Sequence, residues 1–137
     1  MLDPKTQIDN YVRACFPYIY VTTWEEGRMI KDLKEIAGEP QRPRDLSMWS
    51  ITQGISDLKT ETRTDCGDPI DAIDSFIECP NSICCFQDIH PFFKGESNPT
   101  FLRKLRDIIN ILKKKKITII FTGPYVEIPK DLSKEVS

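Results

Sequence analysis

Compact apolar runs alternate along the chain with longer segments in which apolar residues recur every three or four positions. The compact runs are typical of buried strands, and the spaced positions are typical of amphipathic helices. The expected strands are 18–22, 47–52, 82–87 and 117–122. The expected helices are 4–15, 23–38, 68–79 and 98–116, the last with the clearest amphipathic pattern.

Polar residues at the ends of these segments support the helix boundaries. Thr23 stands three positions before Glu26, which is the capping-box spacing. Asp68 precedes Pro69, so an aspartate cap and a proline at the first helical position are expected there. The lysines of 113–116 suit the carboxyl end of a helix, where the helix dipole favours positive charge.

The segment 53–67 is polar, lacks a clear hydrophobic period and has Gly54 and Gly67 near its ends. We therefore predict a loop there. No role for this loop can be assigned from its residues.

Strands that are apolar without alternation, separated by amphipathic helices, indicate a parallel sheet covered on both faces. The prediction is a three-layer α/β fold with a mainly parallel sheet of four or five strands. With 137 residues and 39% hydrophobic content, the chain can bury one core, so a single domain over 1–137 is expected.

Composition narrows the classes of partner. The formal net charge is -2, so the overall charge attracts neither a polyanion nor an acidic surface. The lysines of 113–116 are flanked by core-forming isoleucines and not by exposed aromatics, which favours a solvated helix end over a nucleic-acid patch, and we expect no nucleic-acid partner. No apolar run approaches the roughly 20 residues of a membrane helix, and the first residues do not resemble a signal peptide. We therefore expect no membrane association, and a cytoplasmic location or the chloroplast stroma.

The chain has five cysteines, no C-x-x-C pair and one histidine. We expect free thiols in a reducing compartment and no zinc site, and Cys84 and Cys85 as core residues of a strand. An enzyme based on a reactive cysteine would need a base near the thiol, and nothing in the sequence ties His90 to one.

In a sheet of this kind the working site lies beyond the carboxyl ends of the strands. A phosphate-binding loop would read G-x-x-x-x-G-K-[ST], but the first strand is followed by a short connection that carries Glu25 and Glu26. Two carboxylates repel a triphosphate, so ATP hydrolysis by this chain alone is not expected. We assign no catalytic, cofactor-binding or metal-binding residue.

Two other strand ends keep polar residues. Asp88 follows the third strand as a Walker B acid would, and Thr122 ends the fourth strand where P-loop ATPases keep a polar sensor. The partner groups for Mg²⁺ are absent, and Asp88 is equally compatible with a loop or cap residue. His90 has no matching nucleophile and is interpreted as a loop-surface residue.

Phe92 and Phe93 are adjacent, and two neighbouring phenylalanines in a loop cannot easily both point inward. They could pack under the following helix, or one of them could form part of a contact surface, and the sequence leaves both interpretations open. The residues of the possible interaction surface are Trp24, Glu25, Glu26, His90, Phe92 and Phe93.

Three groups of residues, in their order and spacing along the chain, resemble the motifs of a known family. They are 16–23 with Glu25-Glu26-x-Arg28, 86–92, and 119–124 with 128–132. The series resembles the N-terminal domain of the AAA+ ATPases described as the hypothetical chloroplast reading-frame ATPase of algae and cyanobacteria. The resemblance covers most of the chain except 38–72.

The resemblance implies a degenerate P-loop NTPase core of the RecA/AAA type, with the working Walker motifs, ATP and Mg²⁺ in a following AAA+ domain. It implies no cofactor for this chain. We expect a fragment of a longer AAA+ protein or a stand-alone relative, with 130–137 beginning a helix. The implied partners are the chain's own AAA+ domain or neighbouring protomers, in a homo-oligomer of the full-length form.

The leading hypothesis is therefore a non-catalytic N-terminal assembly or regulatory domain of an AAA+ ATPase. One alternative is a degenerate receiver-like signalling domain, which would use Asp88 and Thr122 with Glu25 and Glu26 as its paired acids. The other alternative is a protein-interaction module unrelated to ATPases.

Overall fold

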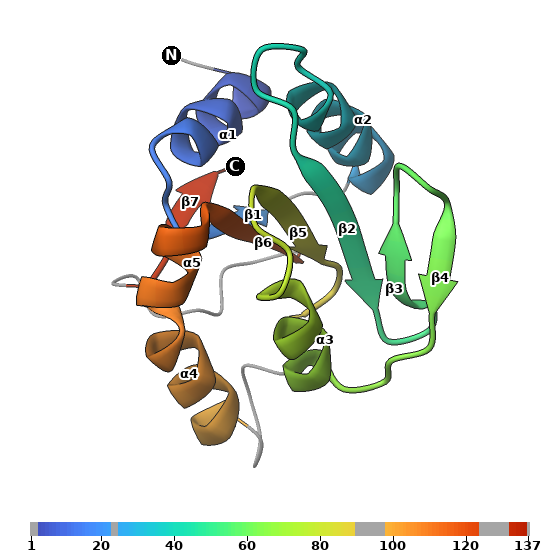
Figure 1. The fold of residues 1–137 in the computed structure, drawn as a ribbon, viewed down its shortest axis with the longest axis vertical. Helices are drawn as coiled ribbons and strands as arrows, with labels where there is room; N and C mark the ends of the chain where they lie inside the picture. The colour runs from blue at the N-terminus through green and yellow to red at the C-terminus, as the bar shows by residue number, and fades with distance from the viewer. Residues whose placement is uncertain (1–2, 23–24, 90–97, 124–131, 137) are drawn as a thin grey trace.

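The computed structural model describes residues 3–22, 25–89, 98–123 and 132–136, which fold into one sheet with helices on both faces (Figure 1). The strands are β1 (Tyr18–Thr22), β2 (Asp45–Ser50), β3 (Gly54–Asp57), β4 (Thr62–Thr64), β5 (Ser82–Phe86), β6 (Ile117–Gly123) and β7 (Lys134–Val136). The helices are α1 (Pro4–Arg13), α2 (Glu26–Ala37), α3 (Pro69–Phe76), α4 (Asn98–Asp107) and α5 (Ile109–Lys115).

The seven strands lie in the order β4-β3-β2-β5-β6-β1-β7. Five of them, β2, β5, β6, β1 and β7, are parallel neighbours, while β3 and β4 form an antiparallel extension at the β2 edge. The α/β class and the mainly parallel sheet are confirmed. The expected count of four or five strands is too low, because the sequence pattern shows the buried strands and misses the short edge strands.

Side chains of β1 alternate between two cores. Ile19 and Val21 pack with α1 and α2 on one face, whereas Tyr18 and Tyr20 pack with α3, α4 and α5 on the other. The central strands β5 and β6 are buried along their whole length. This two-sided burial explains why those strands are apolar without alternation.

Polar groups inside the cores are bonded to the backbone of distant elements. The Tyr18 hydroxyl donates to the Leu105 carbonyl at 2.6 Å, and the Trp49 indole N–H donates to the Cys66 carbonyl at 2.9 Å. Burial also raises the pKa of Tyr18 far above its usual value, so the phenol stays a donor. These two bonds satisfy the polar atoms of Tyr18 and Trp49, so that both rings can fill the core.

The predicted loop over 53–67 is wrong, because β3 and β4 form a hairpin there. Gly54 has φ +68°, and a Cβ on it would lie 2.3 Å from the Thr64 carbonyl oxygen, so only glycine allows this close crossing. The Asp57 carboxylate accepts the backbone N–H groups of Lys59 and Thr60 in the turn. The hairpin extends the sheet edge and is largely solvated, which is why its residues lack an apolar pattern.

The expected helix over 130–137 is also wrong where the structure describes it. Lys134–Val136 is the parallel strand β7, paired with β1 through Ile19, Tyr20 and Val21, and Val136 is buried. A three-residue strand has too short a sequence to show a period, and its pairing with β1 decides its conformation.

Other boundaries differ less. The strand expected at 47–52 begins two residues earlier, at Asp45, and the long helix is divided at Ile108 into α4 and α5. The Asp68 cap is confirmed, since its carboxylate accepts the Ile70 N–H at 2.8 Å. The N-cap of α2 is Glu25, whose side chain makes no capping hydrogen bond, and Thr23 of the expected capping box lies outside the described residues.

Within the described part of the chain, no helix is long and apolar enough to cross a membrane.

Candidate functional site

The carboxyl ends of β1, β5 and β6 meet at one edge of the sheet. Thr22 is in register with Gly123, and Phe86 is in register with Phe121. Helix α2 begins at the same edge, with its cap residue Glu25 only three positions after Thr22. This edge therefore gathers four of the residues that the sequence singles out, namely Glu25, Glu26, Asp88 and Thr122.

Glu26 lies in the first turn of α2 and is half-buried. The side-chain amide of Gln87, just after β5, donates to its carboxylate at 3.3 Å. Burial, followed by the negative charge of nearby Asp88, raises the pKa of Glu26. The positive end of a helix attracts anions, and here the anion is a carboxylate of the chain itself.

Asp88 lies where the sequence predicts it, directly beyond β5, and it is exposed. Its φ of 51° places it in the left-handed region, which aspartate tolerates better than most residues. No group of three or more metal-ligating side chains is found among the residues that the structure describes. Asp88 thus lies directly beyond a buried strand, and the described side chains around it form no such group.

Thr122 is completely buried, and its hydroxyl lies 3.4 Å from the Phe86 carbonyl, to which it donates. The hydroxyl thereby links β6 to β5 inside the sheet. Thr22 makes a similar link to the carbonyl of Val136 in β7, also at 3.4 Å. Both threonines stabilise strand pairing at the edge where a sensor residue would face a nucleotide.

Of the possible interaction surface, the structure describes Glu25 and Glu26. Glu25 is exposed and lies 3.5 Å from the Arg28 guanidinium one helical turn later. Trp24, His90, Phe92 and Phe93 lie outside the described residues. The structure therefore joins Glu26, Gln87 and Asp88 into one polar cluster, of which Gln87 was missed by the sequence analysis.

A cavity of about 300 Å³ opens between α1, α2 and the end of β1. Its floor includes Ile8 and Met29, and its rim includes Lys5, Arg28 and Glu25. The rim cations have carboxylate partners, since Lys5 pairs with Glu35 of α2 and Arg28 with Glu25. The sequence gives no signal for this cavity, because its walls are brought together only by the packing of α1 on α2.

The adjacent cysteines of β5 are structural. Cys84 and Cys85 are buried, and burial raises the pKa of Cys84 to about 12 and that of Cys85 further. Such thiols stay protonated at neutral pH, whereas a nucleophilic cysteine needs a lowered pKa. The sequence-based interpretation of this pair as core residues is confirmed.

Comparison of the sequence with models of known protein families gives a match over almost the whole chain. Residues 4–137 match the family model described as the N-terminal domain of SpoVK-like AAA ATPases. No curated protein matches the chain. The expected relationship to AAA+ N-terminal domains is thus confirmed at the level of the ATPase class.

Proposed function

The chain belongs to the family of N-terminal domains of SpoVK-like AAA ATPases, and from this premise we propose that it is a non-catalytic assembly or regulatory module of an AAA ATPase. The observation that carries the proposal is the place of Glu26. Its carboxylate occupies the start of α2, where an ATPase core would bind phosphate.

The strand order supports descent from an ATPase core. The parallel strands run β7-β1-β6-β5-β2, so the first strand lies between the last two, as in RecA-type P-loop cores. In such a core the phosphate loop connects the first strand to the next helix. Here β1 ends at Thr22 and α2 begins at Glu26, which is too short a connection for the eight-residue loop motif.

Electrostatics at this edge also act against nucleotide binding. Glu25, Glu26 and Asp88 are all acidic, and the Gln87 amide already donates to Glu26. A triphosphate placed at the start of α2 would meet two carboxylates, that of Glu25 at the cap and that of Glu26 in the first turn. The connection from β1 to α2 carries no lysine in its sequence to neutralise phosphate as a P-loop does.

The receiver alternative is disfavoured by topology. Flavodoxin-like receivers have the strand order 2-1-3-4-5, in which the first strand lies beside the third parallel strand. In this sheet β6 lies between β1 and β5, so Asp88 and the acids of the β1 edge come from strands that are not neighbours. Family membership likewise favours the ATPase-linked module over an interaction module unrelated to ATPases.

In the longer protein that we propose, ATP and Mg²⁺ belong to the AAA domain. The partners of this chain would be that domain and neighbouring protomers of a homo-oligomer, in the cytoplasm or a chloroplast stroma. The residue groups 16–23, 86–92 and 119–124 support a relationship to the plastid and cyanobacterial ATPases.

Isothermal titration calorimetry of the chain with ATP and ADP, with and without Mg²⁺, tests the proposal. We expect no saturable binding up to millimolar nucleotide. The matched control is Lys114→Glu, which weakens any counterion binding to the lysines of α5. Saturable binding that survives in this variant and shifts the NMR signals of Thr22 and Glu26 would contradict the proposal.

Acetyl phosphate tests the receiver alternative. We expect no mass increase of the chain after incubation with acetyl phosphate and Mg²⁺. A phosphoryl adduct that is lost in Asp88→Ala would favour a receiver and contradict the proposed function.

A further inference from the structure

A groove of about 530 Å³ opens at the amino edge of the parallel sheet. It lies between helix α5, the turn that follows α1 and the start of β7, which Figure 1 shows close together. Tyr18 begins β1 at this edge, whereas Thr22 ends β1 at the other. The groove is therefore separate from the edge on which the proposed function is argued.

The walls of the groove are largely apolar. They include Phe16 and Pro17 of the turn after α1, Ile109 of α5, and Leu132 just before β7. Phe16 is fixed by an edge-to-face contact with Tyr11 of α1, in which the ring centroids are 5.4 Å apart. A ligand with an apolar body would remove these walls from water, which favours its binding.

Two lysines give the groove a positive charge. Lys113 of α5 and Lys134 of β7 line it, and both are exposed. Neither forms an ion pair within the part of the chain that the structure describes, and the described lining residues include no aspartate or glutamate. The Nζ atom of Lys134 lies 4.9 Å from the centroid of the Phe16 ring, so a cation–π contact places this charge against an apolar wall.

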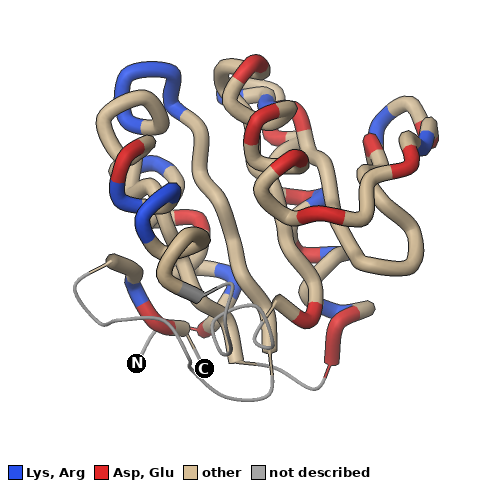
Figure 2. The backbone as a smooth tube through the Cα atoms, turned by 90° about the horizontal axis from the view of Figure 1, so that it is seen from below, with Lys and Arg blue, Asp and Glu red and all other residues tan. Residues whose placement is uncertain are grey.

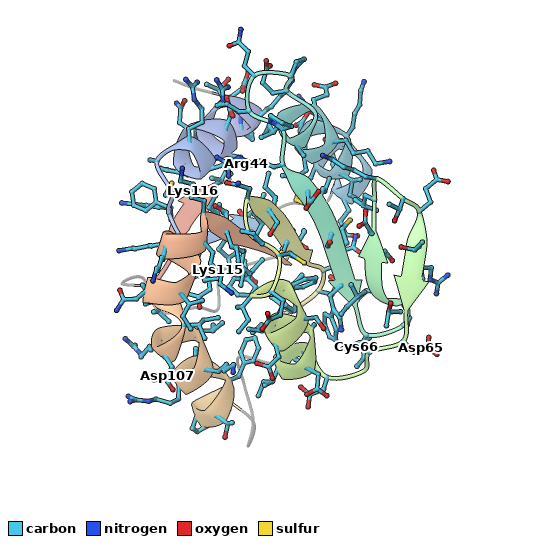
Figure 3. All side chains as sticks on the ribbon, in the orientation of Figure 1. Arg44, Asp65, Cys66, Asp107, Lys115 and Lys116 are labelled. Atoms are coloured by element: carbon cyan, nitrogen blue, oxygen red, sulfur yellow. The ribbon has the colours of Figure 1, made fainter. Side chains whose placement is uncertain are left out.

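Positive charge dominates the end of α5 that borders the groove. Lysines occupy all four positions of 113–116, and Figure 2 shows blue segments on the side of the molecule that holds α4 and α5. Asp107 is the only acid in the sequence of these two helices, and it pairs with Arg103 at 3.0 Å. Figure 3 shows Asp107 on α4, on the far side of Lys115 from Lys116. The charges around the groove thus favour an anion.

Ser133 adds a hydrogen-bonding group that the chain itself does not use. It lines the groove between Leu132 and Lys134, and its Oγ atom is buried without a hydrogen-bond partner among the described residues. A buried hydroxyl without a partner costs free energy. A ligand atom that accepts a hydrogen bond from Ser133 would remove that cost, and the oxygens of an ionised carboxylate are such acceptors.

We propose that this groove is a binding site for a small organic acid, in which a carboxylate is attached to an apolar body. The carboxylate binds Lys113 and Lys134 and accepts a hydrogen bond from Ser133. The apolar body packs on Phe16 and Ile109. The volume of the groove lies within the range of about 300–1,000 Å³ that holds small-molecule ligands. This site goes beyond the proposed function and does not depend on it.

NMR titration of the chain with phenylbutyrate, in about 150 mM NaCl, tests the site. We expect saturable shifts of the backbone amide signals of Ser133, Lys134 and Ile109, with a dissociation constant of about 1 mM or below. Phenylbutyramide lacks the charge, and acetate lacks the apolar body. Each of these two should bind at least about tenfold more weakly than phenylbutyrate.

Two lysine variants test the charge of the groove. Lys113→Met and Lys134→Met should each weaken phenylbutyrate binding by about fivefold or more, because each removes one charge and keeps an apolar chain. Lys114→Met is the matched control. Lys114 is the next residue of α5 but lines a different groove, with Pro80 and Asn81, so its loss should leave binding unchanged. The thermal midpoint of each variant establishes that it is folded.

Ser133→Ala separates a role in binding from a role in folding. Because the Oγ atom has no partner in the free chain, its removal should leave the thermal midpoint unchanged or raise it. The same change should weaken phenylbutyrate binding by about threefold or more, since the carboxylate loses a donor. A lower thermal midpoint with unchanged binding would contradict the proposed role of Ser133.

Cys15 provides a second readout, because it lines the same groove and is partly exposed. Saturating phenylbutyrate should slow the alkylation of Cys15 by iodoacetamide. The rate at Cys79, which is exposed and does not line the groove, should stay the same. Peptide mass spectrometry measures both rates in one sample.

Three outcomes would overturn the proposal. They are the absence of saturable shifts up to about 20 mM phenylbutyrate, equal binding of phenylbutyramide or acetate, and binding that is insensitive to both Lys113→Met and Lys134→Met. Shifts confined to Thr22 and Glu26 would place the ligand at the other edge of the sheet and would also overturn it. Nucleotide binding is measured separately, so failure of this site leaves the proposed function intact.

Discussion

The side-chain amide of Gln87 lies 3.3 Å from the carboxylate of Glu26, and this contact joins the end of β5 to the first turn of α2. Sixty-one residues separate the two in sequence. The contact places a negative charge of the chain at the helix terminus that would otherwise attract an anion.

The pKa of Glu26 should lie above its ordinary value of 4.5, because burial and then the charge of Asp88 favour the protonated form. NMR titration of the Glu26 carboxyl carbon measures it. Asp88→Asn removes the second cause and should lower the Glu26 pKa relative to the native chain. Asp71→Asn, on the other face of the sheet, is the control and should leave it unchanged.

The same shift has a consequence for stability. Between pH 4.5 and the raised pKa, the folded state holds a proton that the unfolded chain has lost. The Glu26 contribution therefore favours folding as the pH falls through this window and opposes folding above it. Urea unfolding of the native chain and Glu26→Gln across pH 4 to 7 should show this pH-dependent difference, and a constant difference would contradict it.

Gly54 should tolerate no side chain. Because its φ is +68° and an added Cβ would lie 2.3 Å from the Thr64 carbonyl oxygen, Gly54→Ala should strain the hairpin, with an expected loss of about 1–3 kcal/mol in the free energy of unfolding. Gly27→Ala is the matched control, because a Cβ there meets nothing within 4 Å. That change in α2 should stabilise the chain by about 0.4–1 kcal/mol. Urea unfolding compares the two.

Asp68 should stabilise α3 through its cap. Its carboxylate accepts the Ile70 N–H at 2.8 Å, so Asp68→Ala should lower the free energy of unfolding by about 1 kcal/mol. Asp68→Asn keeps an oxygen acceptor and should retain most of that stability. Equal losses in both variants would show that the charge, and not the cap, is what α3 needs.

The cysteines should differ in reactivity according to burial. Cys79 is exposed, whereas Cys84 and Cys85 are buried with raised pKa values. Iodoacetamide at pH 8 should therefore alkylate Cys79 in the folded chain and reach Cys84 and Cys85 only after unfolding. Peptide mass spectrometry identifies the sites, and Cys79→Ser should remove the fast phase at that position. Rapid native labelling of Cys84 would contradict the structure of β5.

The sequence by itself determined the strands that have a continuous apolar run and the helix that has a local cap. The strand 18–22 was predicted at its observed bounds, and α3 was predicted with its Asp68 cap. These features depend on a few adjacent residues, because burial on both faces needs a continuous apolar run and a cap needs one side chain beside one backbone group. The α/β class followed from the alternation of the two patterns.

Only the tertiary structure decided the edges of the sheet and the polar cluster. The hairpin depends on the crossing of Gly54 past Thr64, and β7 depends on pairing with β1, more than a hundred residues earlier in the chain. The Glu26–Gln87 contact depends on the strand order. Short solvated strands and single polar contacts leave little mark on the local sequence, because the groups that stabilise them lie far away along the chain.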